Sequence, residues 1–355
     1  MAIANNLADR RETADVLIAD VKDTPRRLKR KCRFVQLDAL RADHVHEATR
    51  GASAAILAVP GHIALASLGH LMGAKIPIVD ISFGPDAPII SAYDKPARKA
   101  GIPVLIDMGV APGLSQLLGG ALRRELPGLK TLRIYCGGLP LDPPPVFRHA
   151  VFFNAHDLLE QYVRPARLRE GGREITCAPL LTTVERLHDY DVGPLEAFVS
   201  DGLRSLLQSY PDIPDMREMT LRFPGHLETM RILHSLGILD SESALAAASA
   251  AIGDRFPASK YMDRVLVEVW GSNGEQQKRY RLHVQQLENQ TAMSRATGYT
   301  AAAAAVFLAN GMFKKPGVHT PEKLGEDAEF TNALLQDLTE RGLQLSTHSK
   351  LRHVM

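Results

Sequence analysis

The sequence predicts an α/β protein in which a doubly wound parallel sheet carries an inserted α+β domain. Up to about residue 125, short apolar runs alternate with helix-like stretches, which is typical of a parallel sheet buried on both faces. An antiparallel hairpin follows near residues 265–284, and this second kind of sheet implies a second domain. We expect residues 1–115 and 297–345 to form the parallel-sheet domain, residues 116–296 the inserted domain, and residues 346–355 a polar, mobile tail.

Each element is predicted from the local pattern. Strands are expected at residues 16–20, 33–37, 54–59, 76–81, 103–107 and 131–138, and helices at 1–11, 43–49, 62–72, 87–99 and 195–208. The hairpin joins residues 265–269 to 280–284 through Asn273 and Gly274, which suits a type I′ turn. A last helix is expected to begin after an N-cap at Thr320 and to end at Gly342.

Composition excludes several classes of protein. The 42 basic and 40 acidic side chains leave a net charge of +2, so neither nucleic acid nor a membrane is an expected partner. Three widely spaced cysteines, Cys32, Cys136 and Cys177, form neither a disulfide framework nor a zinc pattern, and a reducing cytoplasm is the expected compartment. The longest apolar runs, at residues 244–252 and 301–309, are too short to span a membrane. His44 and His46 do not share a helix face, so no metal site is predicted.

The strand at residues 16–20 ends on Asp20, and this position predicts contact with a dinucleotide. In a dinucleotide-binding βαβ unit, a carboxylate at the end of the second strand accepts hydrogen bonds from the adenosine ribose and repels the 2′-phosphate of NADP. Asp20 therefore favours NAD. Lys22, Arg26 and Arg27 lie close by in sequence, so NADP is not excluded. The alternative is that Asp20 only caps a turn or a helix.

Further candidates follow the other predicted strands, at the sheet edge where such folds bind ligands. They are Asp38 and Ala39, expected to flank adenine; Val59 and Pro60, expected to line the cofactor cleft; and Ser82, expected near the nicotinamide. Turn chemistry is the competing explanation for Asp38 and for the Pro-Gly pair.

Several short runs together resemble the saccharopine dehydrogenase-like family, most closely its lysine 6-dehydrogenase branch. The runs are residues 79–83 (VDISF), 107–115 (DMGVAPGLS), 161–166 (QYVRPA), 193–198 (GPLEAF), 201–204 (DGLR), 221–226 (LRFPGH) and 291–301 (TAMSRATGYTA). The resemblance extends from about residue 2 to residue 342. It implies a Rossmann-type domain, an inserted domain for substrate binding and dimerisation, and NAD-linked oxidation or reduction at the amine-bearing carbon of a lysine-like amino acid. A homodimer is implied as well.

One part of the family pattern is missing, because the sequence starts just after the place of the first strand and its glycine-rich turn. In the strand order 3-2-1-4-5-6 the first strand lies between the second and the fourth. We consider two outcomes. Either about 20 further residues lie upstream, or the second and fourth strands pair directly and the pyrophosphate cradle is lost.

Candidate residues for the chemistry come from the middle of the chain. Arg164 is expected to pair with a substrate carboxylate, since a guanidinium matches carboxylate geometry. Asp201 or Glu196 is expected to hold an ammonium group. His149 and His226 are candidates for proton transfer because imidazole titrates near neutrality. The remaining candidates are Tyr162 and Arg204 for substrate binding, and Asp107, which either lies in the catalytic site or caps its own turn. For Arg164 and the histidines, a purely structural role is the alternative.

Three functions remain open at this stage. The first is an NAD-dependent dehydrogenase acting on lysine or a lysine-like amino acid. The second is a reductase that makes or cleaves a secondary amine, such as saccharopine. The third is a catalytically impaired homologue with a truncated cofactor site, which acts as a binding or structural protein. The missing glycine turn favours the third function, and the otherwise intact family runs oppose it.

Overall fold

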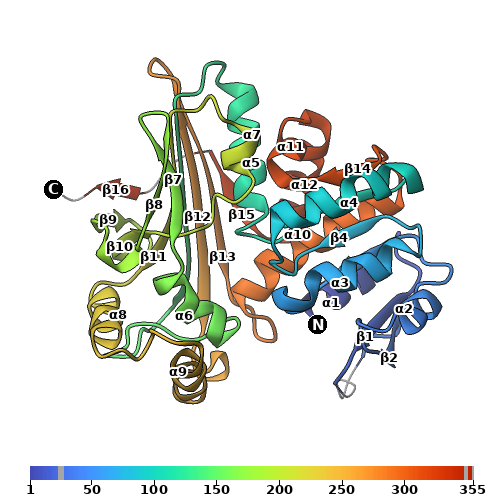
Figure 1. The fold of residues 1–355 in the computed structure, drawn as a ribbon, viewed down its shortest axis with the longest axis horizontal. Coiled ribbons are helices and arrows are strands. Elements are labelled where there is room, and N and C mark those ends of the chain that lie inside the picture. The colour runs from blue at the N-terminus through green and yellow to red at the C-terminus, as the bar shows by residue number, and fades with distance from the viewer. Residues whose placement is uncertain (23–27, 348–350, 354–355) are drawn as a thin grey trace. The chain divides into compact units, whose positions relative to one another are not determined.

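The computed structural model describes residues 1–22, 28–347 and 351–353 (Figure 1). The chain forms two compact units. Unit 1 comprises Met1–Ala121 and Ala296–Arg341, and unit 2 comprises Leu122–Arg295 and Gly342–Met355. Arg26 and Arg27, which kept NADP open, lie outside the described residues. Within the described part of the chain, none of the helices has both the length and the apolar character required to cross a lipid bilayer.

Unit 1 is built on parallel strands. A four-stranded sheet has the order β14-β5-β4-β3, formed by Gly317–His319, Pro103–Leu105, Ile78–Asp80 and Ala55–Leu57. A separate parallel pair consists of β1 (Val16–Asp20) and β2 (Cys32–Gln36). The helices of this part of the chain are α1 (Ala2–Ala8), α2 (Ala42–Ala48), α3 (Gly61–Met72), α4 (Asp86–Ala100), α5 (Leu114–Glu125), α10 (Ala292–Ala309), α11 (Pro321–Gly325) and α12 (Ala328–Glu340).

The central strands of unit 1 are buried along their whole length. All three residues of β4 and all three of β5 are buried, and Leu68 of α3 and Ile89 of α4 pack into the same core. Helices therefore cover the sheet, as the near-continuous apolar runs predict. The predicted α/β class with a Rossmann-type parallel sheet is confirmed.

The pair β1–β2 is not joined to the larger sheet. In the described residues β1 forms a ladder with β2, and β3 forms one with β4. The alternative in which the strands on either side of the missing one pair directly is therefore wrong. Much of β1 is solvent-exposed, including 41% of Leu17, so water can satisfy its backbone groups. A small core of Ala4, Ala8, Val16 and Cys32 holds α1 on the pair.

Unit 2 is built on a ten-stranded mixed sheet. Eight strands follow the order β15-β13-β12-β6-β11-β10-β9-β16, and β7 and β8 branch from β11. The strands are β6 (Thr131–Pro140), β7 (Ala166–Glu170), β8 (Arg173–Cys177), β9 (Glu185–Asp189), β10 (Gly193–Val199), β11 (Asp215–Arg222), β12 (Asp263–Ser272), β13 (Gln277–Gln285), β15 (Gln344–Ser346) and β16 (Leu351–His353). The helices are α6 (Ala155–Val163), α7 (Leu206–Ser209), α8 (His226–Ser235) and α9 (Glu242–Arg255), with short 3₁₀ turns at Pro179–Leu181 and Ala258–Lys260.

The predicted hairpin is confirmed, but its turn type is wrong. Strands β12 and β13 pair from Arg264↔Gln285 to Ser272↔Gln277, which leaves four residues in the loop. A type I′ turn needs positive φ at both Asn273 and Gly274, whereas in this described loop only Gly274 has it, at 98°.

Three other expectations are corrected. Residues 193–199 form strand β10, and only Leu206–Ser209 is helical in the predicted helix at 195–208. The pattern was ambiguous because Leu195 and Phe198 also fit helical spacing, and pairing with β9 and β11 selects the strand. The helix predicted after Thr320 is divided into α11 and α12, because Asp327 caps a new helix. Within the predicted tail, Leu351–His353 forms β16 on β9, whereas residues 348–350 and 354–355 lie outside the described residues.

Candidate functional site

The predicted cofactor residues of unit 1 lie where parallel strands end. The carboxyl ends of β3 and β4 are joined through Ser82. Its hydroxyl accepts a hydrogen bond from the Val59 backbone (3.2 Å) and donates one to the Leu57 carbonyl (3.3 Å). Its own N–H donates to Asp80 (2.8 Å). Ser82 therefore holds the two turns together, whatever it binds.

The backbone at this edge is strained. Phe83 and Asp107 adopt positive φ values of 50° and 56°, which is uncommon for residues other than glycine. Gly61 approaches so closely that an added Cβ would lie 2.8 Å from the Phe83 carbonyl oxygen. Strain of this kind is concentrated at functional sites. It supports a ligand-binding role for the turns that contain Pro60, Ser82 and Asp107.

The two acids of the predicted adenosine site are exposed turn residues. Asp20 accepts a hydrogen bond from the Lys22 backbone (2.9 Å), and Asp38 accepts one from the Leu40 backbone (2.9 Å). Ala39 lies within the second turn. Both acids therefore stabilise their own turns, as the alternative explanation predicts. Each turn uses only one carboxylate oxygen, so the exposed Asp20 retains an acceptor that fits a ribose hydroxyl.

Unit 2 contains a buried polar chain formed by Gln161, Arg222, Tyr162 and His226. Arg222 donates through Nη2 to Gln161 Oε1 (3.0 Å) and through Nε to the Tyr162 oxygen (2.8 Å). The Tyr162 hydroxyl lies 2.7 Å from His226 Nε2, and His226 Nδ1 lies 2.6 Å from the Phe147 carbonyl. The links come from α6, the end of β11 and the first turn of α8. The resemblance runs 161–166 and 221–226 therefore meet in space.

The protonation states of Tyr162 and His226 fix the direction of each hydrogen bond in this polar chain. Burial, reinforced by the charge of Arg222, lowers the pKa of His226 to about 3, so the imidazole is neutral near pH 7. The carbonyl of Phe147 can only accept, so Nδ1 carries the proton and Nε2 accepts from Tyr162. Burial raises the pKa of Tyr162 and outweighs the opposing effect of Arg222, so the phenol keeps its proton.

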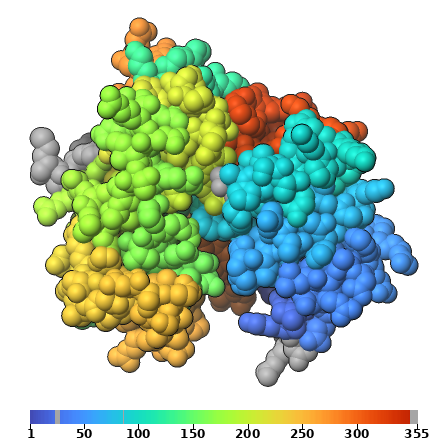
Figure 2. Space-filling view, in the orientation of Figure 1, coloured from blue at the N-terminus to red at the C-terminus, as the bar shows by residue number. Residues whose placement is uncertain are grey.

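His149 lies beside this chain. Its ring centroid is 5.1 Å from that of His226, and it is 1% exposed. Neither ring nitrogen has a hydrogen-bond partner among the described residues. Burial is the main cause that lowers the pKa of His149 well below its ordinary value, and the charge of Arg222 adds to it. Both histidines are thus neutral and sealed from water. Helices α8, which begins at His226, and α9 form the yellow surface in the lower left of Figure 2.

The other predicted substrate residues are engaged with protein groups. Arg164 forms an ion pair with Glu160 on α6. Asp201 accepts from Arg167 Nε at 3.0 Å. Arg204 is buried at a positive φ of 50°. Of the predicted substrate-binding set, the structure brings Tyr162 together with His149 and His226. Arg222, which sequence reasoning missed, connects to them.

A buried acid on β11 was also missed. Glu218 is 5% exposed, and it accepts a hydrogen bond from the Ser200 hydroxyl, which lies 2.6 Å from the Thr220 hydroxyl. Burial is the main cause that raises the pKa of Glu218 to about 8, so the side chain is protonated at neutral pH. The available signal was the alternation of β11, which places Glu218, Thr220 and Arg222 on one face.

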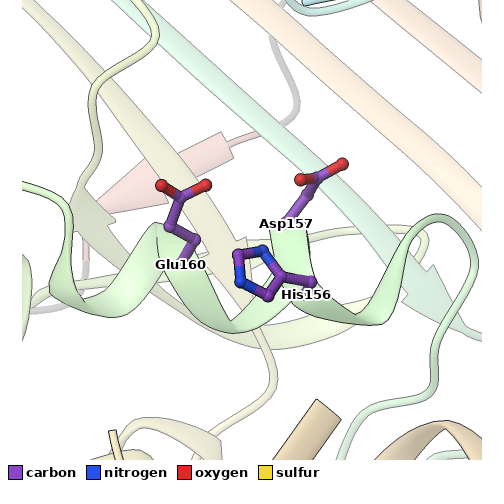
Figure 3. Close-up of side chains that lie close together, drawn as sticks. All are labelled: His156, Asp157 and Glu160. Carbon is purple, nitrogen blue, oxygen red and sulfur yellow. The ribbon is translucent and has the colours of Figure 1, made fainter. Parts of the chain in front are cut away.

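One group of metal-ligating side chains occurs in the described part of the chain. His156, Asp157 and Glu160 project from α6 (Figure 3), with one potential ligand atom from each within 4.8 Å of the others. His156 is paired with Glu242 at 3.0 Å, and Glu160 with Arg164. An ion would have to displace both contacts, so we assign no metal to this group.

The fold is that of a two-unit α/β protein with a Rossmann-type parallel sheet in one unit and a mixed sheet in the other. The model of the saccharopine dehydrogenase C-terminal domain matches residues 109–343. The chain therefore belongs to the saccharopine dehydrogenase-like family.

A solved structure agrees at the level of fold. Apo saccharopine dehydrogenase (L-Glu forming) from Saccharomyces cerevisiae is similar with a TM-score of 0.75 and 16% identity, over 98% of this chain and 97% of that one. The C. glutamicum DAP dehydrogenase in complex with DAP matches with a TM-score of 0.47 and 11% identity, over 96% and 95% of the two chains. An engineered D-amino acid dehydrogenase bound to NADP⁺ matches with a TM-score of 0.47 and 12% identity, also over 96% and 95% of the two chains. The last two are too distant to support an inference.

Proposed function

We propose that this protein is an NAD(P)-dependent oxidoreductase that acts on the amine-bearing carbon of an amino acid. The family match over residues 109–343 carries the proposal. Lysine, or a lysine-like amino acid such as saccharopine, is the proposed substrate. We further propose a homodimer in the cytoplasm, with neither nucleic acid nor membrane as a partner.

NAD is the proposed cofactor, bound at the carboxyl edge of the parallel strands of unit 1. Asp20 would accept from the adenosine ribose, Asp38 and Ala39 would flank adenine, and Val59, Pro60 and Ser82 would line the remainder of the site. When bound, NAD supplies the hydride acceptor, and the protein supplies orientation and electrostatics. The strained turns at Phe83 and Asp107 support this placement.

The residues of unit 2 are proposed to handle the amino acid. Arg164 would exchange Glu160 for the substrate carboxylate, and Asp201 would exchange Arg167 for an ammonium group, while Tyr162 and Arg204 shape the site. His149 and His226 are proposed for proton transfer, as is Asp107, which belongs to unit 1. Position supports this assignment, since the two imidazole rings lie 5.1 Å apart beside Tyr162. Their lowered pKa values oppose it, because a general base works best with a pKa near the working pH.

A second candidate is a catalytically impaired homologue with a binding role. The observation that favours it is the separation of β1–β2 from the β3-containing sheet. Dinucleotide sites of this type lie where such strands meet.

Calorimetric titration with NAD and NADP separates the two candidates. We expect NAD to bind more tightly, and D20A to weaken NAD binding at least about tenfold because a charge-assisted acceptor is lost. D15A is the matched control, since Asp15 is an exposed acid just before the other end of β1. Binding followed by lysine- or saccharopine-dependent NADH formation supports the enzyme. Absence of dinucleotide binding overturns it and leaves the impaired homologue.

A further inference from the structure

One face of the sheet in unit 2 carries a row of basic and aromatic side chains. The strand register places Trp270 of β12 opposite Arg133 of β6, and Arg133 opposite Arg217 of β11. Residues directly opposite on paired strands point to the same face. We call Trp270, Arg133 and Arg217 the arginine row. It uses none of the residues assigned to the proposed function.

The acids near the two arginines of the row offset their positive charge only in part. Among the described residues, the closest carboxylates to Arg217 are Glu170 at 3.5 Å from Nη2 and Glu185 at 3.9 Å from Nη1. Glu185 already accepts from the Tyr135 hydroxyl at 2.9 Å. Burial, followed by repulsion from Arg217, lowers the pKa of Arg133, and the opposing attraction of Tyr135, Glu185 and Asp215 is weaker. Two like charges thus lie side by side on adjacent strands.

Each member of the row also has a buried donor without an acceptor. In the part of the chain that the structure describes, these atoms are Arg133 Nη1, Arg217 Nε and Trp270 Nε1. All three can only donate, and buried donors are nearly always paired in folded proteins. Three unpaired donors in one row, two of them cationic, indicate an absent acceptor that carries negative charge.

We infer that the arginine row is a binding site for a phosphate group. A planar carboxylate pairs best with the two-pronged fork of one arginine. Here one buried donor without an acceptor comes from each of three neighbouring strands. A tetrahedral dianion has oxygens in several directions and a charge that matches two guanidinium groups. Phosphate therefore fits the row better than a monocarboxylate does.

The protein contains a single tryptophan, so its emission reports on this site directly. We expect inorganic phosphate to change Trp270 emission in a saturable manner at constant ionic strength. Acetate and chloride at the same ionic strength should leave the emission unchanged. Phosphate bound at a site remote from Trp270 should leave this signal unchanged.

Variants test whether phosphate binds at the arginine row. R133Q and R217Q should each raise the apparent Kd for phosphate at least about tenfold, because each loses a charge-assisted hydrogen bond. R264Q is the matched control. Arg264 lies on the same face of β12 with an unpaired Nε, about 20 Å along the strand from Trp270, and its loss should leave the Kd unchanged.

Stability measurements keep the test decisive if a variant folds poorly. Without phosphate, R133Q should melt at or above the melting temperature of the wild type, because it removes one of two adjacent like charges. Added phosphate should raise the melting temperature of the wild type but not that of R133Q. The inference is overturned if Trp270 emission does not respond to phosphate. It is equally overturned if R133Q and R217Q respond as the wild type does, or if R133Q lowers the melting temperature without phosphate.

Discussion

At the scale of single residues, the Tyr162 hydroxyl connects the buried polar chain, because it accepts from Arg222 and donates to His226. Y162F would leave a buried guanidinium N–H and a buried imidazole nitrogen unpaired. We expect the free energy of unfolding to fall by about 1–3 kcal/mol, measured by urea denaturation.

Y93F is the comparison for this prediction. The Tyr93 hydroxyl donates one hydrogen bond to the Leu65 carbonyl (2.7 Å). Its removal should cost about 0.5–1.5 kcal/mol. Equal losses in the two variants would show that the links to Arg222 and His226 add no stability beyond that of an ordinary hydrogen bond.

Glu218 should make stability depend on pH. Its pKa is raised from 4.5 to about 8 in the folded protein, so between these values the folded state holds a proton that the unfolded chain releases. The free energy of unfolding should therefore fall as pH rises through this window, by up to about 1.4 kcal/mol per pH unit. E218Q, which stays neutral, should lack this contribution.

The difference between the wild type and E218Q across pH 5–8 isolates the effect, because every other titrating group is common to both proteins. Urea unfolding at each pH provides the measurement. A pH-independent difference would mean that Glu218 is ionised in the folded state.

Sequence reasoning found some of these residues but not their contacts. Tyr162 and His226 were candidates from local runs, yet their hydrogen bond joins positions 64 apart in the chain. Residue type alone does not encode such proximity. Glu218 and Arg222 were missed because charged residues are rarely fully buried, although the alternation of β11 carried the signal.

At the scale of elements, the pair β1–β2 should be the least protected sheet of unit 1. It has two strands, it is largely exposed, and isolated two-stranded sheets are marginal. We expect its backbone amides to exchange with deuterium at least about tenfold faster than those of the buried strand β4. Hydrogen exchange followed by mass spectrometry measures this, and equal protection of both strands would contradict it.

Elements were predictable where the local pattern admits a single interpretation. The strands β3, β4 and β5 follow from short apolar runs bounded by turn residues. The predicted helix at residues 195–208 failed because apolar residues at spacings of three and two coexist there. Hydrogen bonding to β9 and β11 selects a strand at residues 193–199. These partners are distant in sequence, so a local pattern does not reveal them. The family strand order predicts a strand between β1 and β3 that this sequence does not supply. It does not predict that β1–β2 and β14-β5-β4-β3 form two separate sheets.

At the scale of the whole molecule, the C-terminal segment completes unit 2. Strand β15 pairs with β13 through His283↔Gln344 to Arg281↔Ser346, and β16 pairs with β9. A chain that ends at Leu343 should show faster amide exchange in β13 and β9, with β4 of unit 1 unchanged.

A chain that ends at Thr347 is the control, because it keeps β15. In that chain only β9 should lose protection. Identical exchange in β13 for all three lengths would mean that β15 contributes nothing to that sheet edge.

The discontinuity of unit 1 has a consequence for biosynthesis. Arg10 of the N-terminal region pairs with Asp337 of α12, 327 positions later, and β5 pairs with β14, which begins at Gly317. A ribosome must therefore translate as far as residue 337 before all of these partners exist. Until then the emerging N-terminal half exposes an unfinished sheet, so we expect it to be held by chaperones while the segment that follows is already forming its own strands.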